Sequence, residues 1–388
     1  MGATSKACAE IFAAGHTLEA GSYNLTPSID STSSRSGGGA SGPCNTSALP
    51  EELVLHAGPY EARINTVGAS LRSLTFKGYP LTDAYELSSD AKAIPFCAGI
   101  VLAPWPNRVR DGQYEFGGRA YHLELTEPER NNAIHGLVGT RRWNIEAGAD
   151  AGRGELWCEV DPSEGWPWPL RVSAVFELAA KAGLTVTYSV TNTGAEDSPL
   201  AFGVHTYLNA WGEPLDECVA TIPVTHCLPL DSERNLPVEP LSLVPLDQTD
   251  SHDGDSDLHG IPVRQGPAER SLARVPENVD LLHGQLMDGV WLDHAFAAAP
   301  AASDSRTARL VHPNGRGVEL TCSREFDWFQ VFTADPAHDA PFPGRGRALA
   351  VEPMTAPPDA LRSGVGITRL EPQAMSRFSL TMSAIEPL

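Results

Sequence analysis

Apolar and polar residues alternate along residues 170–191, and this period-two pattern constrains the fold more than any other feature of the chain. Every second residue of 170–178 is apolar with polar residues between, Val175 excepted, and the alternation resumes over 184–190. Successive side chains of a strand point to opposite faces of its sheet, so each run predicts a strand with one buried face. The glycine-containing link at 181–183 joins the runs, which predicts an antiparallel hairpin.

Shorter runs of this kind recur at 155–160, 317–323 and 328–333, while long amphipathic helical stretches are scarce. The 35 glycines and 32 prolines break the chain into many short segments. Many short strands separated by turn residues are typical of a β-sandwich or barrel. The sequence therefore predicts an all-β fold, with few short helices.

The N-terminal residues and one internal stretch differ in composition from the rest of the chain. Residues 31–47 are mostly Ser, Gly and Thr, so we expect residues 1–48 to form a disordered or loosely packed N-terminal extension. Apolar residues begin to recur near Leu53, and we expect a single domain over 49–388. The polar, charged stretch at about 243–285 predicts a surface insertion, with a functional lid as the alternative.

Charge and cysteine usage exclude several classes of protein. A net charge of −21 disfavours nucleic acid and anionic membrane surfaces as partners and favours a small neutral or cationic ligand. No apolar run approaches the ~20 residues of a membrane helix. The N-terminus makes a weak signal peptide, and the seven cysteines contain no CxxC pair, so we expect reduced thiols in the cytoplasm. Neither a Walker loop nor a dinucleotide-type GxGxxG is present.

Five short clusters set polar side chains among apolar and aromatic ones, at 104–108, 131–136, 202–207, 291–296 and 351–355. Each cluster also has an ordinary structural interpretation. His205 suits a core histidine, Arg108 a partner for a carboxylate across the sheet, Asn107 and His135 turns, and Asp293 a strand end. Glu352 is harder to explain in this way. It follows Ala-Leu-Ala-Val, and a buried carboxylate is costly unless it is paired or functional.

Together these residue types suit a sugar site. A glutamate and a histidine can supply a general base and a general acid, and Asn, Arg, Asp and a second His can hold hydroxyl groups. The usual glycosidase would need two opposed carboxylates instead. A metal site from His135, His205 and Asp293 is conceivable, but no HxH or HExxH spacing supports it, so we expect no metal.

The order of the clusters resembles the aldose 1-epimerase (galactose mutarotase) family over about residues 53–386. The matching motifs, in chain order, are Pro-Asn107-Arg108-Val, Gly112-x-Tyr114-x-Phe116 with Tyr121-x-Leu123, Asn132-Ala-Ile-His135-Gly136, His205-Thr206-Tyr207-Leu208-Asn209, Asp293-His294-x-Phe296, Phe329-Gln330-Val331-Phe332-Thr333 and Glu352-Pro353. His135-Gly136-Leu137 departs from the His-Gly-Gly common in the family. That departure bears on the preferred sugar more than on the chemistry.

The resemblance implies a large antiparallel β-sandwich of the galactose mutarotase-like supersandwich type, an open cleft on a concave sheet, and catalysis without a cofactor. It implies that Glu352 is the base for the anomeric hydroxyl and His205 the acid for the ring oxygen. Sugar-holding roles fall on the residues that match the family's binding positions, Asn107, Arg108, His135, Asp293 and Gln330.

The resulting expectation is a cytoplasmic mutarotase that interconverts the α- and β-anomers of a glucose- or galactose-type aldose. Its partner is a monosaccharide, and the protein is expected as a monomer or homodimer. One alternative is a hexose-6-phosphate 1-epimerase on the same fold, which would need extra cationic residues around the phosphate. The other is a non-catalytic sugar-binding module, which would be expected to lack the glutamate or the histidine.

Overall fold

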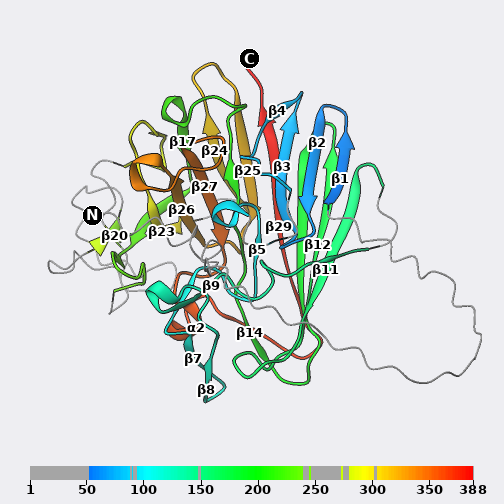
Figure 1. The fold of residues 1–388 in the computed structure, drawn as a ribbon, viewed down its shortest axis with the longest axis vertical. Helices are drawn as coiled ribbons and strands as arrows, with labels where there is room; N and C mark the ends of the chain where they lie inside the picture. Colours follow the sequence, from blue (N-terminus) through cyan, green and yellow to red (C-terminus); the bar gives the residue numbers. More distant parts are fainter. Residues whose placement is uncertain are drawn as a thin grey trace, which may run out of the picture.

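The computed structural model describes residues 52–87, 90, 94–146, 150–238, 244–245, 272–273, 279–300 and 304–387. The extension expected at 1–48 and most of the insertion expected at 243–285 lie outside these residues. Helices are few and short within them (Figure 1). They are η2 (Pro95–Cys97), η3 (Pro128–Arg130), η4 (Leu215–Glu217), η5 (Pro336–His338) and the α-helix α2 (Ala360–Ser363).

A nine-stranded antiparallel sheet forms one layer of the molecule. Its strands, in spatial order, are β10 (Asn144–Ile145), β11 (Arg153–Val160), β12 (Leu170–Ala179), β13 (Gly183–Asn192), β29 (Met375–Ile385), β25 (Gly317–Ser323), β24 (Ser305–Val311), β17 (Val219–Thr221) and β22 (Gln285–Leu286). The hairpin predicted from the alternating runs is β12–β13, in register from Leu170 opposite Asn192 to Ala179 opposite Gly183. β29, which is the last of these strands along the chain, lies between β13 and β25.

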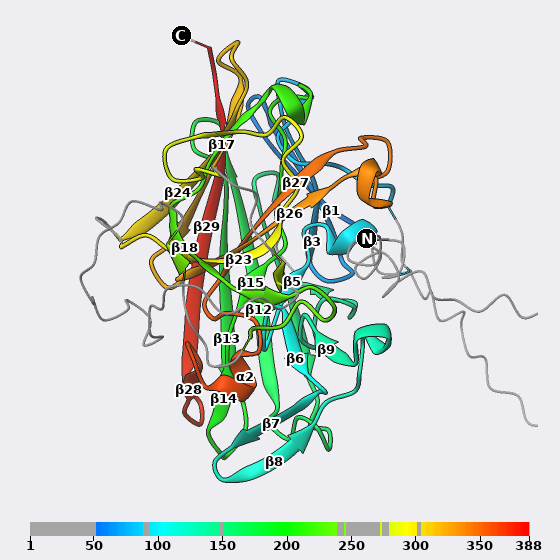
Figure 2. The same cartoon turned by 90° about the vertical axis from the view of Figure 1, so that its left-hand side faces the viewer.

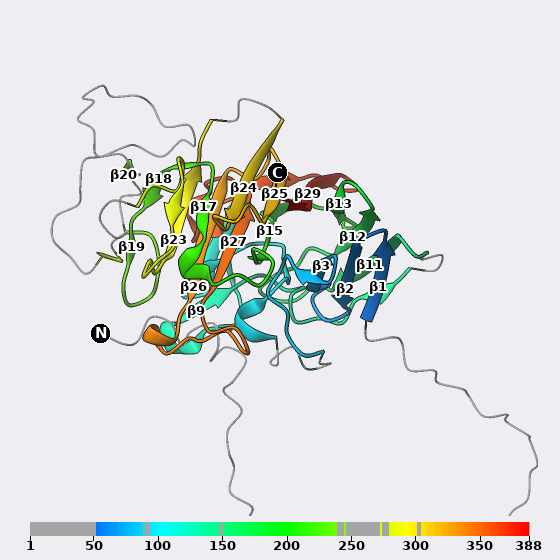
Figure 3. The same cartoon turned by 90° about the horizontal axis from the view of Figure 1, so that it is seen from above.

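A second large antiparallel sheet carries the shorter apolar strands. In spatial order it contains β20 (Val244–Pro245), β18 (Val224–Leu228), β23 (Asp293–Ala298), β26 (Trp328–Ala334), β27 (Ala348–Met354), β15 (Gly203–Val204) and β5 (Val101–Leu102), and β16 (Tyr207–Leu208) also pairs with β27. Seen from above, β26 and β27 lie on the inner side of the arc formed by β24, β25, β29, β13 and β12 (Figure 3).

Smaller sheets complete the described chain. A four-stranded sheet contains β1 (Glu52–Ala57), β2 (Tyr60–Asn65), β3 (Ser70–Phe76) and β4 (Tyr79–Pro80). The two-stranded units are β6 (Arg108–Arg110) with β9 (Asn132–Ile134), β7 (Gln113–Phe116) with β8 (Arg119–His122), β14 (Ser198–Leu200) with β28 (Thr368–Leu370), and β19 (Leu230–Asp231) with β21 (Leu272–Ala273). The β6–β9 and β7–β8 units lie with α2 at one end of the molecule (Figure 2).

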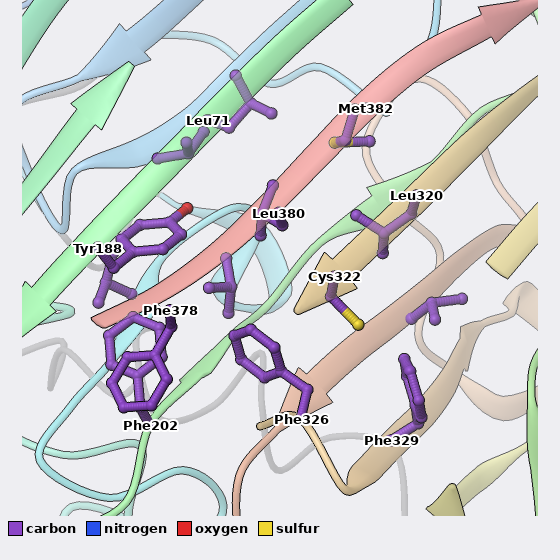
Figure 4. Close-up of a cluster of buried hydrophobic side chains, with 14 of the residues drawn as sticks. Leu71, Tyr188, Phe202, Leu320, Cys322, Phe326, Phe329, Phe378, Leu380 and Met382 are labelled. Atoms are coloured by element: carbon purple, nitrogen blue, oxygen red, sulfur yellow. The ribbon is translucent and has the colours of Figure 1, made fainter. Parts of the chain in front are cut away.

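The main hydrophobic core lies between the two large sheets. Leu320, Leu380 and Met382 of the nine-stranded sheet belong to the same buried cluster as Phe329 and Val351 of the eight-stranded sheet. Figure 4 shows the side chains of this cluster converging from both layers. Burial of such side chains is the dominant stabilising contribution to folding. The fold is therefore the antiparallel β-sandwich that the sequence predicted.

Two further observations concern the helices and the cysteines. None of the helices in the described part of the chain is long and apolar enough to cross a membrane. Five cysteines fall in that part, and all are buried and free of disulfides: Cys97, Cys158, Cys218, Cys227 and Cys322.

Candidate active site

Strand register brings Glu352 and His205 together. The chain running from β15 into β16 lies antiparallel to β27, with Gly203 opposite Met354 and Tyr207 opposite Ala350. Counting inward from both pairs places His205 opposite Glu352. Across the other edge of β27, Glu352 is paired with Gln330 of β26. Gln330 and Glu352 therefore stand side by side on neighbouring strands, and His205, in the link between β15 and β16, extends the row.

The pleat of β27 explains why Glu352 is held away from the sandwich core. Leu349 and Val351 point into the main core, whereas Ala348 and Ala350 belong to a separate apolar cluster on the opposite face. Alternation places Glu352 on that opposite face. Met354, two residues further, belongs to a third cluster. The carboxylate thus lies between two apolar patches, on the face of the sheet that the core does not fill.

The two side chains touch. His205 Nε2 lies 3.2 Å from Glu352 Oε1, and each side chain is 2% exposed. Tyr207 stacks on the His205 ring at 5.5 Å between centroids, and His135 meets that ring edge-on at 5.5 Å. A carboxylate and an imidazole in hydrogen-bond contact can share or exchange a proton, which is the arrangement an acid–base pair needs.

Gln330 links two of the other predicted sugar-holding residues. Its amide Nε2 donates to Asp293 Oδ1 at 2.7 Å, and its Oε1 accepts from Asn107 Nδ2 at 3.2 Å. Gln330 sits on β26 and Asp293 at the start of β23, the adjacent strand. Because an amide has a donor end and an acceptor end, Gln330 fixes Asn107 and Asp293 relative to each other and to Glu352.

Asn107 and His135 face each other across the end of the β6–β9 unit. The backbone N–H of His135 donates to the backbone oxygen of Asn107 at 3.0 Å, and the backbone N–H of Asn107 donates to the ring nitrogen Nδ1 of His135 at 3.3 Å. Both residues have positive φ, 56° and 63°, a conformation that non-glycine residues rarely adopt. Gly136 follows with φ 74°, and a Cβ there would lie 2.1 Å from Ala103 O, so only glycine fits.

Arg108 is held by a glutamate that the sequence analysis missed. Its Nε and Nη2 donate to the two carboxylate oxygens of Glu127 at 2.8 and 2.9 Å, and both side chains are buried. Asn132 Nδ2 donates to Glu127 as well, and Arg130 lies 3.8 Å from it. Bidentate pairing of this kind fixes the plane of a guanidinium. The carboxylate partner considered for Arg108 from the sequence is therefore present.

A turn after β19 joins the β6–β9 unit to the eight-stranded sheet. Arg234 donates to Asp111 Oδ1 at 2.8 Å and to Asn132 Oδ1 at 3.0 Å. Its neighbour Asn235 donates to the backbone oxygen of Asp293 at 3.5 Å. Neither residue carried a sequence signal, because the partners lie far away along the chain. The turn fixes the β6–β9 unit against the strand that carries Asp293.

Asn209, from the motif that contains His205, has a structural role. Its Nδ2 donates to Asp83 Oδ1 at 2.5 Å, and Arg345 Nε lies 3.3 Å from the same oxygen. Burial raises the pKa of Asp83 to about 6, although Arg345 and Asn209 oppose that rise by favouring the charged form. This buried aspartate supports the segment that follows His205.

One group of residues has the composition of a metal site. Cys97, His135 and His205 place one potential ligand atom each within 4.8 Å of one another. Both histidines belong to the metal site considered from the sequence, but Asp293 is not in this group and Cys97 takes its place. No signal in the sequence pointed to Cys97, because its partners are distant along the chain.

Comparison with known proteins places the fold among the galactose mutarotase-like β-sandwiches. The chain belongs to the aldose 1-epimerase family, whose family model matches residues 51–383. The protein YihR of Escherichia coli (strain K12) is 29% identical over 322 residues, covering 83% of this chain and 89% of that protein.

Two solved structures show the same fold. The GalM/aldose epimerase homologue from C. elegans aligns with a TM-score of 0.68 at 15% identity, covering 87% of this chain and 99% of that one. The galactose 1-epimerase from Lactobacillus acidophilus NCFM aligns with a TM-score of 0.62 at 16% identity, covering 87% and 95%. At these identities the likeness concerns the fold alone.

Proposed function

We propose that this chain is a mutarotase that interconverts the α- and β-anomers of a glucose- or galactose-type aldose. Glu352 removes the proton from the anomeric hydroxyl while His205 protonates the ring oxygen, and the bond from C1 to the ring oxygen breaks. The open-chain aldehyde turns about C1–C2. The two groups then act in reverse and close the ring on the other face.

The observation that carries this proposal is the buried contact of 3.2 Å between His205 and Glu352. The anomeric oxygen and the ring oxygen are bonded to the same carbon, so groups that act on both must lie close together. A pair separated by one hydrogen bond meets that requirement. Burial of both side chains keeps competing water away from the proton transfer, once the two oxygens of the sugar have replaced the contact between the side chains.

The remaining predicted residues are proposed to hold the other hydroxyl groups. Asn107, Gln330 and Asp293 form one hydrogen-bonded chain beside Glu352. A chain of fixed donors and acceptors suits vicinal hydroxyl groups, each of which both donates and accepts. His135 lies edge-on to His205, and Arg108 is oriented by Glu127. Such positioning raises the rate because the reacting carbon is held between acid and base.

The charge around the site favours an unphosphorylated sugar over the hexose-6-phosphate alternative. Among the described residues, the buried arginine side chains are Arg108, Arg130 and Arg306. The first two both lie against Glu127, whose single negative charge offsets one of their two positive charges, and Arg306 pairs with Asp327 at 2.7 Å. A phosphate group carries about two negative charges, more than the one positive charge that these pairs leave over.

The test is the rate at which freshly dissolved α-glucose and α-galactose reach anomeric equilibrium, followed by proton NMR. Wild-type protein should accelerate this approach, and Glu352→Gln at the same concentration should not. Acceleration confined to α-glucose 6-phosphate would select the phosphosugar alternative. Protection by sugar in thermal melts without any acceleration would indicate a binding module and overturn the proposal.

A further inference from the structure

The group formed by Cys97, His135 and His205 has a composition that the proposed sugar chemistry does not require. Its three ligand atoms lie within 4.8 Å of one another, and the residues are 1%, 8% and 1% exposed. They come from three separate segments, η2, the end of β9 and the end of β15. Mutarotation as proposed uses His205 for proton transfer and His135 for binding, and it assigns nothing to a thiol.

The backbone around Cys97 is held in an unusual conformation that aims it at this place. Phe96 and Cys97 have φ of 45° and 56°, and such left-handed conformations cost on the order of 1 kcal/mol or more for non-glycine residues. Gly99 N–H donates to His205 O at 2.7 Å, which ties the segment to the strand bearing the proposed acid. Tyr207 Oη donates to Phe96 O at 3.4 Å, directly before the cysteine.

We propose that Cys97, His135 and His205 form an inhibitory binding site for a thiophilic divalent cation such as Zn²⁺. One thiolate and two imidazoles are a ligand set that zinc accepts in proteins, with water in the fourth position. Tetrahedral bonds of about 2.0–2.3 Å place ligand atoms roughly 3.5 Å apart. Small side-chain rotations from the observed separations therefore suffice to close the site.

Local charge favours the cation, and one hydrogen bond opposes it. Glu352 Oε1 lies 3.2 Å from His205 Nε2, so a carboxylate stands beside one of the proposed ligands. The backbone N–H of Asn107 donates to His135 Nδ1, a bond of 3.3 Å that metal binding through that ring would disturb. Metal binding also releases the thiol proton to solvent, which makes affinity rise with pH. The site is thus exchangeable rather than structural.

Occupancy of this site would stop the proposed reaction. A metal bound to His205 removes the imidazole from its role as acid, and it draws His135 away from the sugar. The inhibition rests on the proposed function, whereas the binding does not. The enzyme as proposed needs no metal for turnover, so a chelator should leave the basal rate unchanged and restore a zinc-inhibited one.

The binding test uses Co²⁺ in place of Zn²⁺, because cobalt bound by a thiolate has a sulfur-to-metal charge-transfer band and tetrahedral cobalt has intense visible bands. Full-length protein titrated anaerobically should show both, and Zn²⁺ should displace them. Cys97→Ala should lose the charge-transfer band. Cys322→Ala removes a cysteine of equal burial from the core and should keep it.

The activity test compares the same variants. Zn²⁺ should inhibit the wild type and Cys322→Ala alike. Cys97→Ala should need a zinc concentration on the order of tenfold higher, or more, for the same inhibition. Cobalt bands that persist in Cys97→Ala, or that are absent from the wild type, would overturn the proposed site while leaving the mutarotase proposal standing. A chain without mutarotase activity that still shows the bands would do the reverse.

Discussion

The two halves of the candidate site are built in different ways. Glu352 stands on β27 of the eight-stranded sheet, and His205 stands opposite it in the short link between β15 and β16, where backbone hydrogen bonds to β27 set their spacing. Asn107 and His135 stand on the β6–β9 unit, with positive φ at both residues. The first half is positioned by regular structure and the second by special turns and side-chain bonds.

This difference separates chemistry from recognition. A strand ladder holds the proposed acid and base to a fixed distance, and proton transfer is sensitive to distance. The β6–β9 unit meets the ladder through specific side-chain bonds, including Asn107 to Gln330 and Asn235 to the backbone of Asp293. Changes in the first half should therefore lower turnover, and changes in the second should lower affinity.

The largest effect is expected from the strand-borne pair. Glu352→Gln and His205→Asn should each cut turnover by about 10²–10⁴, because each removes one positioned proton-transfer group. Glu352→Gln conserves volume and His205→Asn keeps a hydrogen-bonding group, so the protein should stay folded and still bind sugar. Anomerisation rates by NMR and sugar protection in thermal melts measure the two quantities. A folded variant with near wild-type turnover would remove that residue from the mechanism.

The next effect tests the half of the site on the β6–β9 unit, through the buried ion pair of Arg108 and Glu127. Arg108→Met should weaken sugar affinity by ~1.5–3 kcal/mol. It should also destabilise the fold by roughly 3–5 kcal/mol, because Glu127 is left buried without its main partner. Calorimetric titration with the sugar and denaturant unfolding report the two losses separately.

The double variant Arg108→Met/Glu127→Gln is the matched control for this pair. It removes the unpaired buried charge and keeps an oxygen that can accept from Asn132 Nδ2, so much of the stability should return. Affinity should stay low. If the double variant instead binds sugar like the wild type, Arg108 serves the fold alone, which is the structural interpretation weighed from the sequence.

A smaller effect tests the junction between the halves. Gln330→Met conserves volume but deletes the bonds to Asn107 and Asp293. An unpaired buried polar group costs ~1–3 kcal/mol, so we expect KM to rise by about tenfold. Turnover at saturation should change little, because Gln330 moves no proton. Steady-state kinetics decide, and a loss confined to kcat would place Gln330 on the catalytic side of the comparison.

The smallest effect on rate is expected from Asp83, which supports the strand-borne half without touching the pair. Burial raises the pKa of Asp83 to about 6 from an ordinary 3.8, despite Arg345 and Asn209. Between these two pH values Asp83 is still protonated in the folded protein but ionised in the unfolded chain. Stability therefore falls as the pH rises through this range.

Asp83→Asn, which does not titrate, should therefore gain stability relative to the wild type from about pH 4 to above pH 6. The gain should be on the order of 3 kcal/mol at most, since a pKa unit corresponds to ~1.4 kcal/mol. Its kcat should match the wild type at neutral pH. Paired denaturant titrations across this range test the sign, and a constant stability difference would contradict it.

The fold could be predicted from the sequence where one face of a strand is exposed to solvent. β12 and β13 alternate between apolar and polar residues, and the structure confirms both strands and their hairpin. β27 shows no such alternation, because all seven of its residues are buried. Its sequence, Ala-Leu-Ala-Val-Glu-Pro-Met, reads as one apolar run interrupted by a charge. Only that charge marked the strand from the sequence.

The site was predictable as a set of residue types and not as a set of contacts. Polar residues in apolar surroundings identified Glu352 and His205, and their contact depends on a register that the sequence does not display. Glu127 sits in the polar stretch Thr-Glu-Pro-Glu-Arg, where a glutamate attracts no notice. Its burial arises only when β6 and β9 pair and bring Arg108 beside it.

The position of β29 has a consequence for how the chain folds as it is synthesised. The β11–β12–β13 meander and the β24–β25 hairpin are local in sequence, so each can form as soon as it leaves the ribosome. Both meet only through β29, the last strand of the described chain. The nascent protein must therefore wait with two open sheet edges until β29 has been synthesised, and a chain that stops before Met375 leaves both edges exposed to other chains.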